Sequence, residues 1–219
     1  LAVSREENVN IFSSYDHCLM KNGKDDVDGN GNYTISILNP DNTLKEVFFF
    51  MDSGSYMTDE SKSEYGVTKD GEVYDGVKTS QVQWYRDKHD ALTAEYGKFK
   101  SITVVHIPPY QAEREYSEDD FLYGEKRESI CESGFDAGLL DVMKEKGGAQ
   151  AVYFGHDHVN DFGVMCDGIL LSYIQPSGYG VYNMETKFDS PESDWIQGAT
   201  LLSIKADGTY TAERIYNHK

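Results

Sequence analysis

Two short runs rich in β-branched and aromatic residues constrain the fold of this chain more than any other feature. One run covers residues 102–105 and the other residues 149–154. Runs of this length and composition are typical of strands that are buried on both faces. Helical spacing of apolar residues precedes each run, in residues 79–96 and 135–146. This alternation predicts βαβ units, in which functional side chains lie at the carboxyl ends of the strands.

Turn-forming residues delimit the other expected elements. Residues 33–39 and 44–52 flank a Pro-Asp-Asn turn and predict a β-hairpin. Residues 53–78 lack clear periodicity and predict a long surface loop. Residues 110–132 predict an acidic insertion with weak helical character. Towards the end of the chain, strands are expected at residues 169–174, 200–205 and 210–216.

The charge balance argues against one class of partner. Asp and Glu number 38 against 20 Lys and Arg, which gives a formal net charge of −18. This negative field repels nucleic acid, so we expect no nucleic-acid partner. An anionic substrate would need a local positive centre, which a pair of metal ions supplies. The 219 residues suffice for one domain or a large piece of one, and no apolar run is long enough for a membrane segment.

The three cysteines and the first residues say little about the compartment. Cys18, Cys131 and Cys166 are odd in number and far apart, which favours free thiols, although one disulfide stays open. The first residues are not a signal peptide, and without an initiating Met we expect the chain to begin in mid-protein. Localisation is therefore unknown, and an extracytoplasmic location stays open.

Three histidines follow the two apolar runs. His156 and His158 come directly after Gly155 at the end of one run, and His106 ends the other. Two residues apart in extended backbone, His156 and His158 would diverge, so two adjacent ions suit them better than one. Neutral imidazole binds Zn, Fe, Mn or Ni, and a pair of such ions can hold a phosphoryl group against an activated water. The alternative is that each is an ordinary hydrogen-bonded histidine at a strand end.

The other three histidines, His17, His89 and His218, lack this context. We expect them to be structural or surface residues.

The histidine pair lies within a longer recognisable stretch. Val-Tyr-Phe-Gly-His-Asp-His-Val-Asn-Asp-Phe, residues 152–162, resembles the last metal-binding motif of calcineurin-like metallophosphoesterases, and is most similar to their purple-acid-phosphatase-like branch. Further pieces that look like this branch occur in the expected order, namely residues 31–33, 50–54, 81–84, 105–108 and 177–180. The resemblance implies an α/β class fold, the α/β/β/α metallophosphoesterase sandwich with two stacked mixed sheets flanked by helices, of which this chain supplies the C-terminal part.

The resemblance also implies a set of metal ligands. His106 and His156 would bind one ion and His158 the other, in a centre of two divalent or trivalent ions such as Fe, Zn or Mn. Asn160 and Asp161 are candidates for residues that orient the ligands through hydrogen bonds, with an ordinary turn pair as the alternative. No residue of this chain is assigned as catalytic.

The earlier motifs of the family, including the bridging aspartate, are missing. We therefore expect residues 1–219 to be the C-terminal portion of a single metallophosphoesterase domain whose N-terminal metal-binding half is missing. The expected partners of the chain are a phosphoester substrate and either the N-terminal half of the same protein or a second copy in a homodimer.

The implied function is phosphoester hydrolysis by the intact protein, a metal-dependent phosphatase. The alternative is a non-catalytic binding or regulatory module that keeps the fold. Because neither ion would have a full set of ligands, this chain alone is expected to bind metal weakly or not at all, and to be catalytically inactive.

One competing motif resembles the start of a calcium loop. Residues 26–31 place Asp or Asn at alternate positions and glycine at the sixth, but the twelfth position is Ile37 instead of Glu. We favour a glycine-rich turn.

Overall fold

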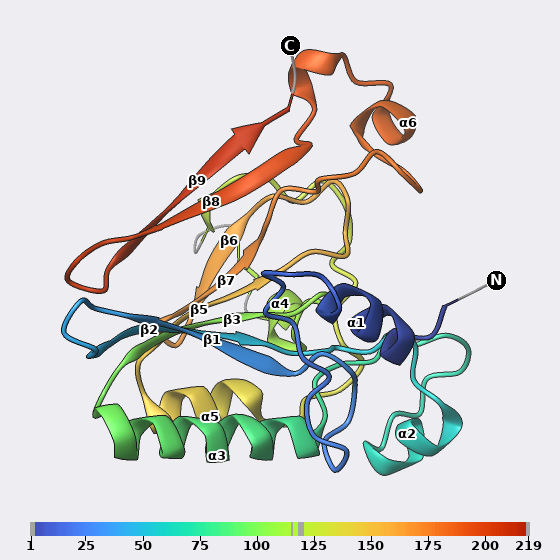
Figure 1. Ribbon diagram of the computed structural model, residues 1–219. Coiled ribbons are helices and arrows are strands. Elements are labelled where there is room, and N and C mark those ends of the chain that lie inside the picture. The colour runs from blue at the N-terminus through green and yellow to red at the C-terminus, as the bar shows by residue number, and fades with distance from the viewer. Residues whose placement is uncertain (1–2, 115, 118–120, 218–219) are drawn as a thin grey trace.

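The computed structural model describes residues 3–114, 116–117 and 121–217 of the chain (Figure 1). It has the expected α/β class, with a large mixed sheet, a smaller second sheet and flanking helices. Its elements are α1 (Arg5–Ser13), β1 (Tyr33–Leu38), β2 (Leu44–Phe50), α2 (Asp59–Glu64), α3 (Thr79–Tyr96), β3 (Lys100–Val104), α4 (Gln111–Arg114), β4 (Phe121–Tyr123), α5 (Leu139–Lys146), β5 (Ala149–Phe154), β6 (Gly163–Cys166), β7 (Ile169–Tyr173), α6 (Met184–Phe188), the 3₁₀ helix η2 (Glu192–Asp194), β8 (Gly198–Ile204) and β9 (Tyr210–Tyr216).

The large sheet has seven strands in the order β1-β2-β3-β5-β7-β6-β4. Its centre is parallel, because β2 pairs parallel with β3, β3 with β5 and β5 with β7. The predicted hairpin is confirmed as the antiparallel pair β1 and β2. The carboxyl ends of the parallel strands therefore meet at one edge of the sheet, as the βαβ prediction requires.

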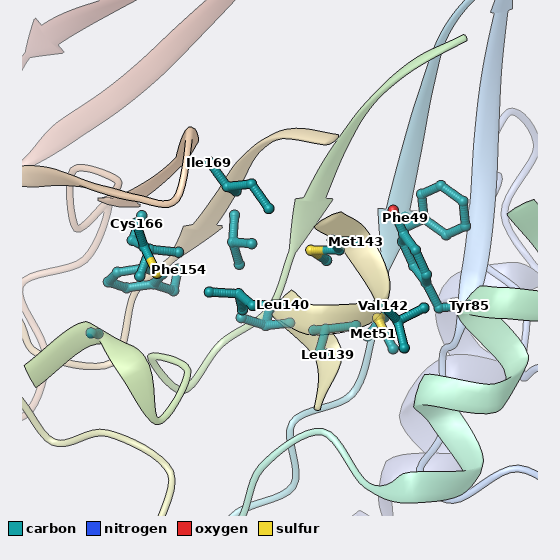
Figure 2. Packing of buried hydrophobic residues seen from close by; sticks show 14 of the residues in the cluster. Phe49, Met51, Tyr85, Leu139, Leu140, Val142, Met143, Phe154, Cys166 and Ile169 are labelled. Atoms are coloured by element: carbon teal, nitrogen blue, oxygen red, sulfur yellow. The ribbon is translucent and has the colours of Figure 1, made fainter. Parts of the chain in front are cut away.

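Different layers cover the two faces of this sheet. Helices α3 and α5 lie on one face, and the β8–β9 ribbon packs on the other (Figure 1). On the helix face, Phe49 of β2 and Tyr85 of α3 are fully buried and their rings lie 4.4 Å apart. Leu140 and Met143 of α5 lie in the same cluster (Figure 2). On the ribbon face, buried Tyr153 lies in a second cluster together with residues of β8 and β9.

Two predicted segments need correction. Residues 53–78 are not a plain surface loop, because Met57 and Val73 are buried against Phe135, and α2 lies between them. Their apolar side chains are too far apart in sequence to show any periodicity. The helix predicted over residues 135–146 begins only at Leu139, because Gly138 adopts a left-handed backbone that interrupts the helical spacing.

The acidic insertion, residues 110–132, is only partly helical. It contains the short helix α4 and the short strand β4, and residues 115 and 118–120 lie outside the described part of the chain. The strand β6 and the helices α1 and α6 were not predicted.

Other expectations concern single residues. Residues 26–31 form a turn, as favoured over a calcium loop, and Ser80 anchors it by donating to the Asp28 carboxylate. His89 is buried beside Phe99 and His17 is exposed, while His218 lies outside the described residues. All three cysteines are free. Within the described ranges, no helix combines the length and apolar character that crossing a membrane requires.

Glu46 of β2 makes stability depend on pH. The residue is 0% exposed, and Gln150 donates to one carboxylate oxygen at 3.1 Å while the other has no partner among the described residues. Burial raises the pKa of Glu46 to about 7, against weaker opposing effects of Gln150 and Lys100. The pKa is thus higher in the folded than in the unfolded chain. Its stabilising contribution is therefore present at low pH and lost as the pH rises through about 7.

We expect Glu46→Gln to remove this pH dependence. Relative to the variant, the parent chain should lose on the order of 2 kcal/mol of unfolding free energy between pH 5 and pH 8. Urea unfolding at both pH values measures this difference, and Glu72→Gln, at an exposed position, is the control. Equal pH dependence of the parent and Glu46→Gln would contradict the assignment.

Candidate functional site

His106 and His156 meet at the carboxyl ends of neighbouring parallel strands. His106 follows β3 and His156 follows β5, and the two strands pair directly. The backbone N–H of Gly155 donates to the His106 carbonyl at 3.1 Å and continues the ladder beyond the strands. Nδ1 of His156 lies 3.3 Å from Nε2 of His106, with the rings nearly perpendicular at 80°. The sheet topology therefore brings two of the predicted ligands into contact.

The backbone around both histidines is fixed by local contacts. The Ser53 hydroxyl accepts from the N–H groups of His106 and Ile107, at 3.2 and 2.9 Å. His156 has a φ of 77°, which a non-glycine residue adopts only when its surroundings enforce it. The Asp157 N–H donates to the Gly155 carbonyl at 3.0 Å and closes a tight turn at this point. Strained backbone of this kind occurs often at functional sites.

The electrostatic surroundings favour neutral imidazoles. Burial lowers the pKa of His106, and the neighbouring His156 and His158 lower it further. Burial is also the main effect that lowers the pKa of His156, partly opposed by Asp157. Neutral imidazole is the form that binds a metal ion.

His158 points to a different partner. Its Nδ1 lies 3.0 Å from the backbone carbonyl oxygen of Tyr182, and its ring stacks on the Tyr182 ring with centroids 4.6 Å apart. His156 instead contacts His106 and the edge of Tyr74. The expectation that extended backbone makes the two side chains diverge is wrong, because residues two apart in a strand point to the same face and His156 is not extended, with a φ of 77°. The two imidazoles have different partners but line the same pocket.

All three histidines line one open pocket of about 400 Å³. Residues 155–158 form one wall and residues 174–178, 180 and 181 form the other. The second wall follows β7, the parallel neighbour of β5, so the pocket lies at the carboxyl edge of the sheet. This edge is where α/β sheets bind ligands.

Sequence reasoning missed Asp157, which lies between the two histidines of the motif. It is 4% exposed, and its carboxylate accepts from the Cys131 N–H at 3.0 Å and from the Tyr173 hydroxyl. Burial raises the pKa of Tyr173, and the Asp157 carboxylate raises it further. Asp157 therefore anchors the histidine turn to β7 and to the segment around Cys131. Only its position inside the motif could have indicated this role.

Asn160 and Asp161 are buried and tie the histidine loop to residues 125–128. Asn160 Oδ1 accepts from the N–H groups of Arg127 and Glu128, and Asp161 Oδ1 accepts from the N–H of Glu125. Among the described residues, no hydrogen bond joins either side chain to one of the three histidines. Their role in orienting metal ligands stays a prediction.

The histidine pair fits part of a metal site. Two nitrogens bound to one tetrahedral ion at 2.0–2.1 Å lie about 3.3 Å apart, which is the separation of His106 Nε2 and His156 Nδ1. A direct N–H···N hydrogen bond is the alternative explanation of the same distance. Over the parts of the chain that the structure covers, no three His, Cys, Asp or Glu side chains converge to hold an ion. The pair therefore offers two nitrogens to an ion at most, and metal binding by them stays a prediction.

Sequence comparison connects the chain to one group of proteins. No family model matches it. It is 30% identical over 169 residues to a protein named probable inactive purple acid phosphatase 14, from Arabidopsis thaliana, which aligns with 71% of the chain and 40% of that protein. Probable inactive purple acid phosphatases 28 and 29 of the same plant are 30% and 29% identical, aligning with 82% and 71% of the chain and with 42% and 41% of their own lengths.

The chain thus spans about 40% of the length of these curated relatives. Among solved structures, a dimetal phosphatase from Danio rerio aligns with 66% of this chain over 49% of its own length. The TM-score is 0.42 and the sequence identity is 13%.

Proposed function

We propose that this chain, which belongs to the purple-acid-phosphatase-like branch of the calcineurin-like metallophosphoesterases, supplies the imidazole ligands of a metal centre for phosphoester hydrolysis. One observation carries the proposal. His106 and His156 face each other at 3.3 Å on neighbouring strand ends, in a pocket that His158 also lines. His106 Nε2 and His156 Nδ1 would bind one ion, and His158 would bind the other.

The two ions, when bound, would polarise the phosphoryl oxygens and lower the pKa of a coordinated water. The residues of this chain prepare the site. Burial lowers the pKa of His106 and of His156, which favours the neutral imidazole whose lone pair can bind an ion. Asp157 and Ser53 hold the two backbone segments, and the pocket leaves room for an oxyanion.

A second candidate function is a binding or regulatory module that keeps the fold without catalysis. Two observations favour it. The relatives themselves are named probable inactive purple acid phosphatases. Within the described ranges, the side chains do not complete a metal site. Under this alternative, the histidine pocket would bind a phosphorylated ligand and leave it unchanged.

Two measurements on the complete translated product of the gene distinguish the two functions. Metal analysis should find two ions per protein, and the protein should hydrolyse a generic aryl phosphate. Fewer than one ion per protein together with no hydrolysis would contradict the catalytic proposal and leave the binding module.

The 219-residue chain by itself should be inactive. Two imidazoles on one ion and one on the other leave most ligand positions to water, so we expect weak metal binding and no turnover of an aryl phosphate above the uncatalysed rate. Turnover by the purified chain would show that ligands within it have been overlooked. The matched control is the same assay with added EDTA.

A further inference from the structure

Tyr182 holds His158 by three contacts. The His158 backbone N–H donates to the Tyr182 hydroxyl oxygen at 3.3 Å, the rings stack at an interplanar angle of 16°, and His158 Nδ1 lies 3.0 Å from the Tyr182 carbonyl oxygen. A carbonyl oxygen only accepts, so the third contact requires the proton on Nδ1. The lone pair of the neutral ring is then on Nε2.

Glu128 in turn anchors Tyr182. The Tyr182 hydroxyl donates to Glu128 Oε1 at 2.9 Å, and the Val159 N–H donates to the same oxygen at 3.2 Å. The Lys187 ammonium binds Glu128 Oε2 and also lies 4.6 Å from the centroid of the Tyr182 ring. The Glu128 side chain is only 10% exposed. The Glu128 carboxylate thus connects Val159, which follows His158 in the chain, to Tyr182, whose ring stacks on that of His158.

Asn160 fixes the backbone of Glu128. Its Oδ1 accepts from the Glu128 N–H at 3.0 Å and its Nδ2 donates to the Glu128 carbonyl at 3.3 Å. Asn160 is 0% exposed, so water does not compete for these bonds. A continuous series of hydrogen bonds therefore runs from Asn160 through Glu128 and Tyr182 to the imidazole of His158.

We infer that Glu128 and Tyr182 are positioning residues that keep His158 in the Nδ1–H tautomer and present its Nε2 lone pair to the pocket. Orientation of a ligand imidazole by a hydrogen bond from its other nitrogen is the usual arrangement around a bound metal. That a metal ion is what Nε2 binds rests on the proposed function. The tautomer itself does not, so the two claims can fail separately.

Nitrogen-15 NMR of the histidine rings tests the tautomer in the metal-free chain. At pH 8.5, where imidazoles are neutral in general, we expect His158 to show a protonated Nδ1 and an unprotonated Nε2. A proton on Nε2, or rapid averaging of both nitrogens, would overturn the inference. This measurement needs no variant, so it remains decisive if a substitution prevents folding.

Two substitutions test the roles of Glu128 and Tyr182. Glu128→Ala removes the oxygen that accepts from the Tyr182 hydroxyl, and Tyr182→Phe removes that hydroxyl, so the share of the Nε2–H tautomer should rise in both. The control is Tyr179→Phe, at a position three residues before Tyr182. It removes a hydroxyl that donates to the Asn217 carbonyl and should leave the tautomer of His158 unchanged. An unchanged tautomer in Glu128→Ala and Tyr182→Phe would show that these side chains do not position the ring.

Addition of Zn²⁺ to the complete translated product of the gene separates this inference from the proposed function. The expected result is a shift of His158 Nε2 while Nδ1 stays protonated, with affinity lowered about 10- to 100-fold in Glu128→Ala. If Zn²⁺ moves neither nitrogen but the tautomer is as expected, the metal proposal fails and the positioning of His158 stands.

Discussion

Asp161→Ala is expected to lower the unfolding free energy by about 3 kcal/mol or more, because it removes one partner of a buried ion-pair network. Asp161 is 2% exposed. Its Oδ1 accepts from Arg127 at 2.7 Å, and its Oδ2 accepts from Arg214 of β9 at 3.0 Å. The carboxylate thereby joins the histidine loop, residues 125–128 and the β8–β9 ribbon. Without it, Arg127 and Arg214 lose their shared counter-charge, and the N–H of Glu125 loses its acceptor.

Chemical denaturation at neutral pH measures this loss. The matched control is Asp90→Ala, which breaks an ion pair with Lys146 at an exposed site on α3 and should unfold like the parent. Similar stabilities for Asp161→Ala and Asp90→Ala would mean that Asp161 is an ordinary turn residue.

The second large effect concerns metal affinity. In the complete translated product of the gene, His156→Asn removes one of the two nitrogens that we place on a shared ion, so Zn²⁺ affinity should fall by at least about a hundredfold, the upper end of losses for residues that only support a ligand. Asparagine tolerates the left-handed backbone that His156 adopts at a φ of 77°. The substitution therefore tests the loss of the imidazole without adding backbone strain at this position.

His17→Asn is the matched control, because His17 also has a positive φ, of 69°, and is exposed outside the pocket. It should bind Zn²⁺ like the parent, as followed by calorimetry. Equal weakening by His17→Asn and His156→Asn would point to non-specific binding on an acidic surface.

Much of the framework of the site could be predicted from the sequence. The bounds of α3 and β5 are those that the periodicity predicts. Adjacent parallel strands then require His106 and His156 to be neighbours, because each lies two residues beyond the end of its strand. These predictions succeeded because they depend on local patterns and on the geometry of parallel sheets.

The supporting contacts could not be predicted in the same way. Glu128 and Tyr182 lie 54 positions apart, in segments without periodicity, and meet only through the loops around the histidines. Residues 53–78 were misjudged for a related reason, since the burial of Met57 and Val73 depends on Phe135. Single-sequence patterns describe elements, whereas these contacts depend on how loops pack.

The identity of the nitrogens that bind Zn²⁺ in the complete translated product of the gene tests the central claim most directly. Nitrogen-15 NMR during a Zn²⁺ titration should show His106 Nε2 and His156 Nδ1 shifting together with one apparent dissociation constant. His106 would then be protonated at Nδ1 and His156 at Nε2. A shift of only one of the two rings, no shift of either, or an equal response of exposed His17 would contradict a shared metal site at the ends of β3 and β5.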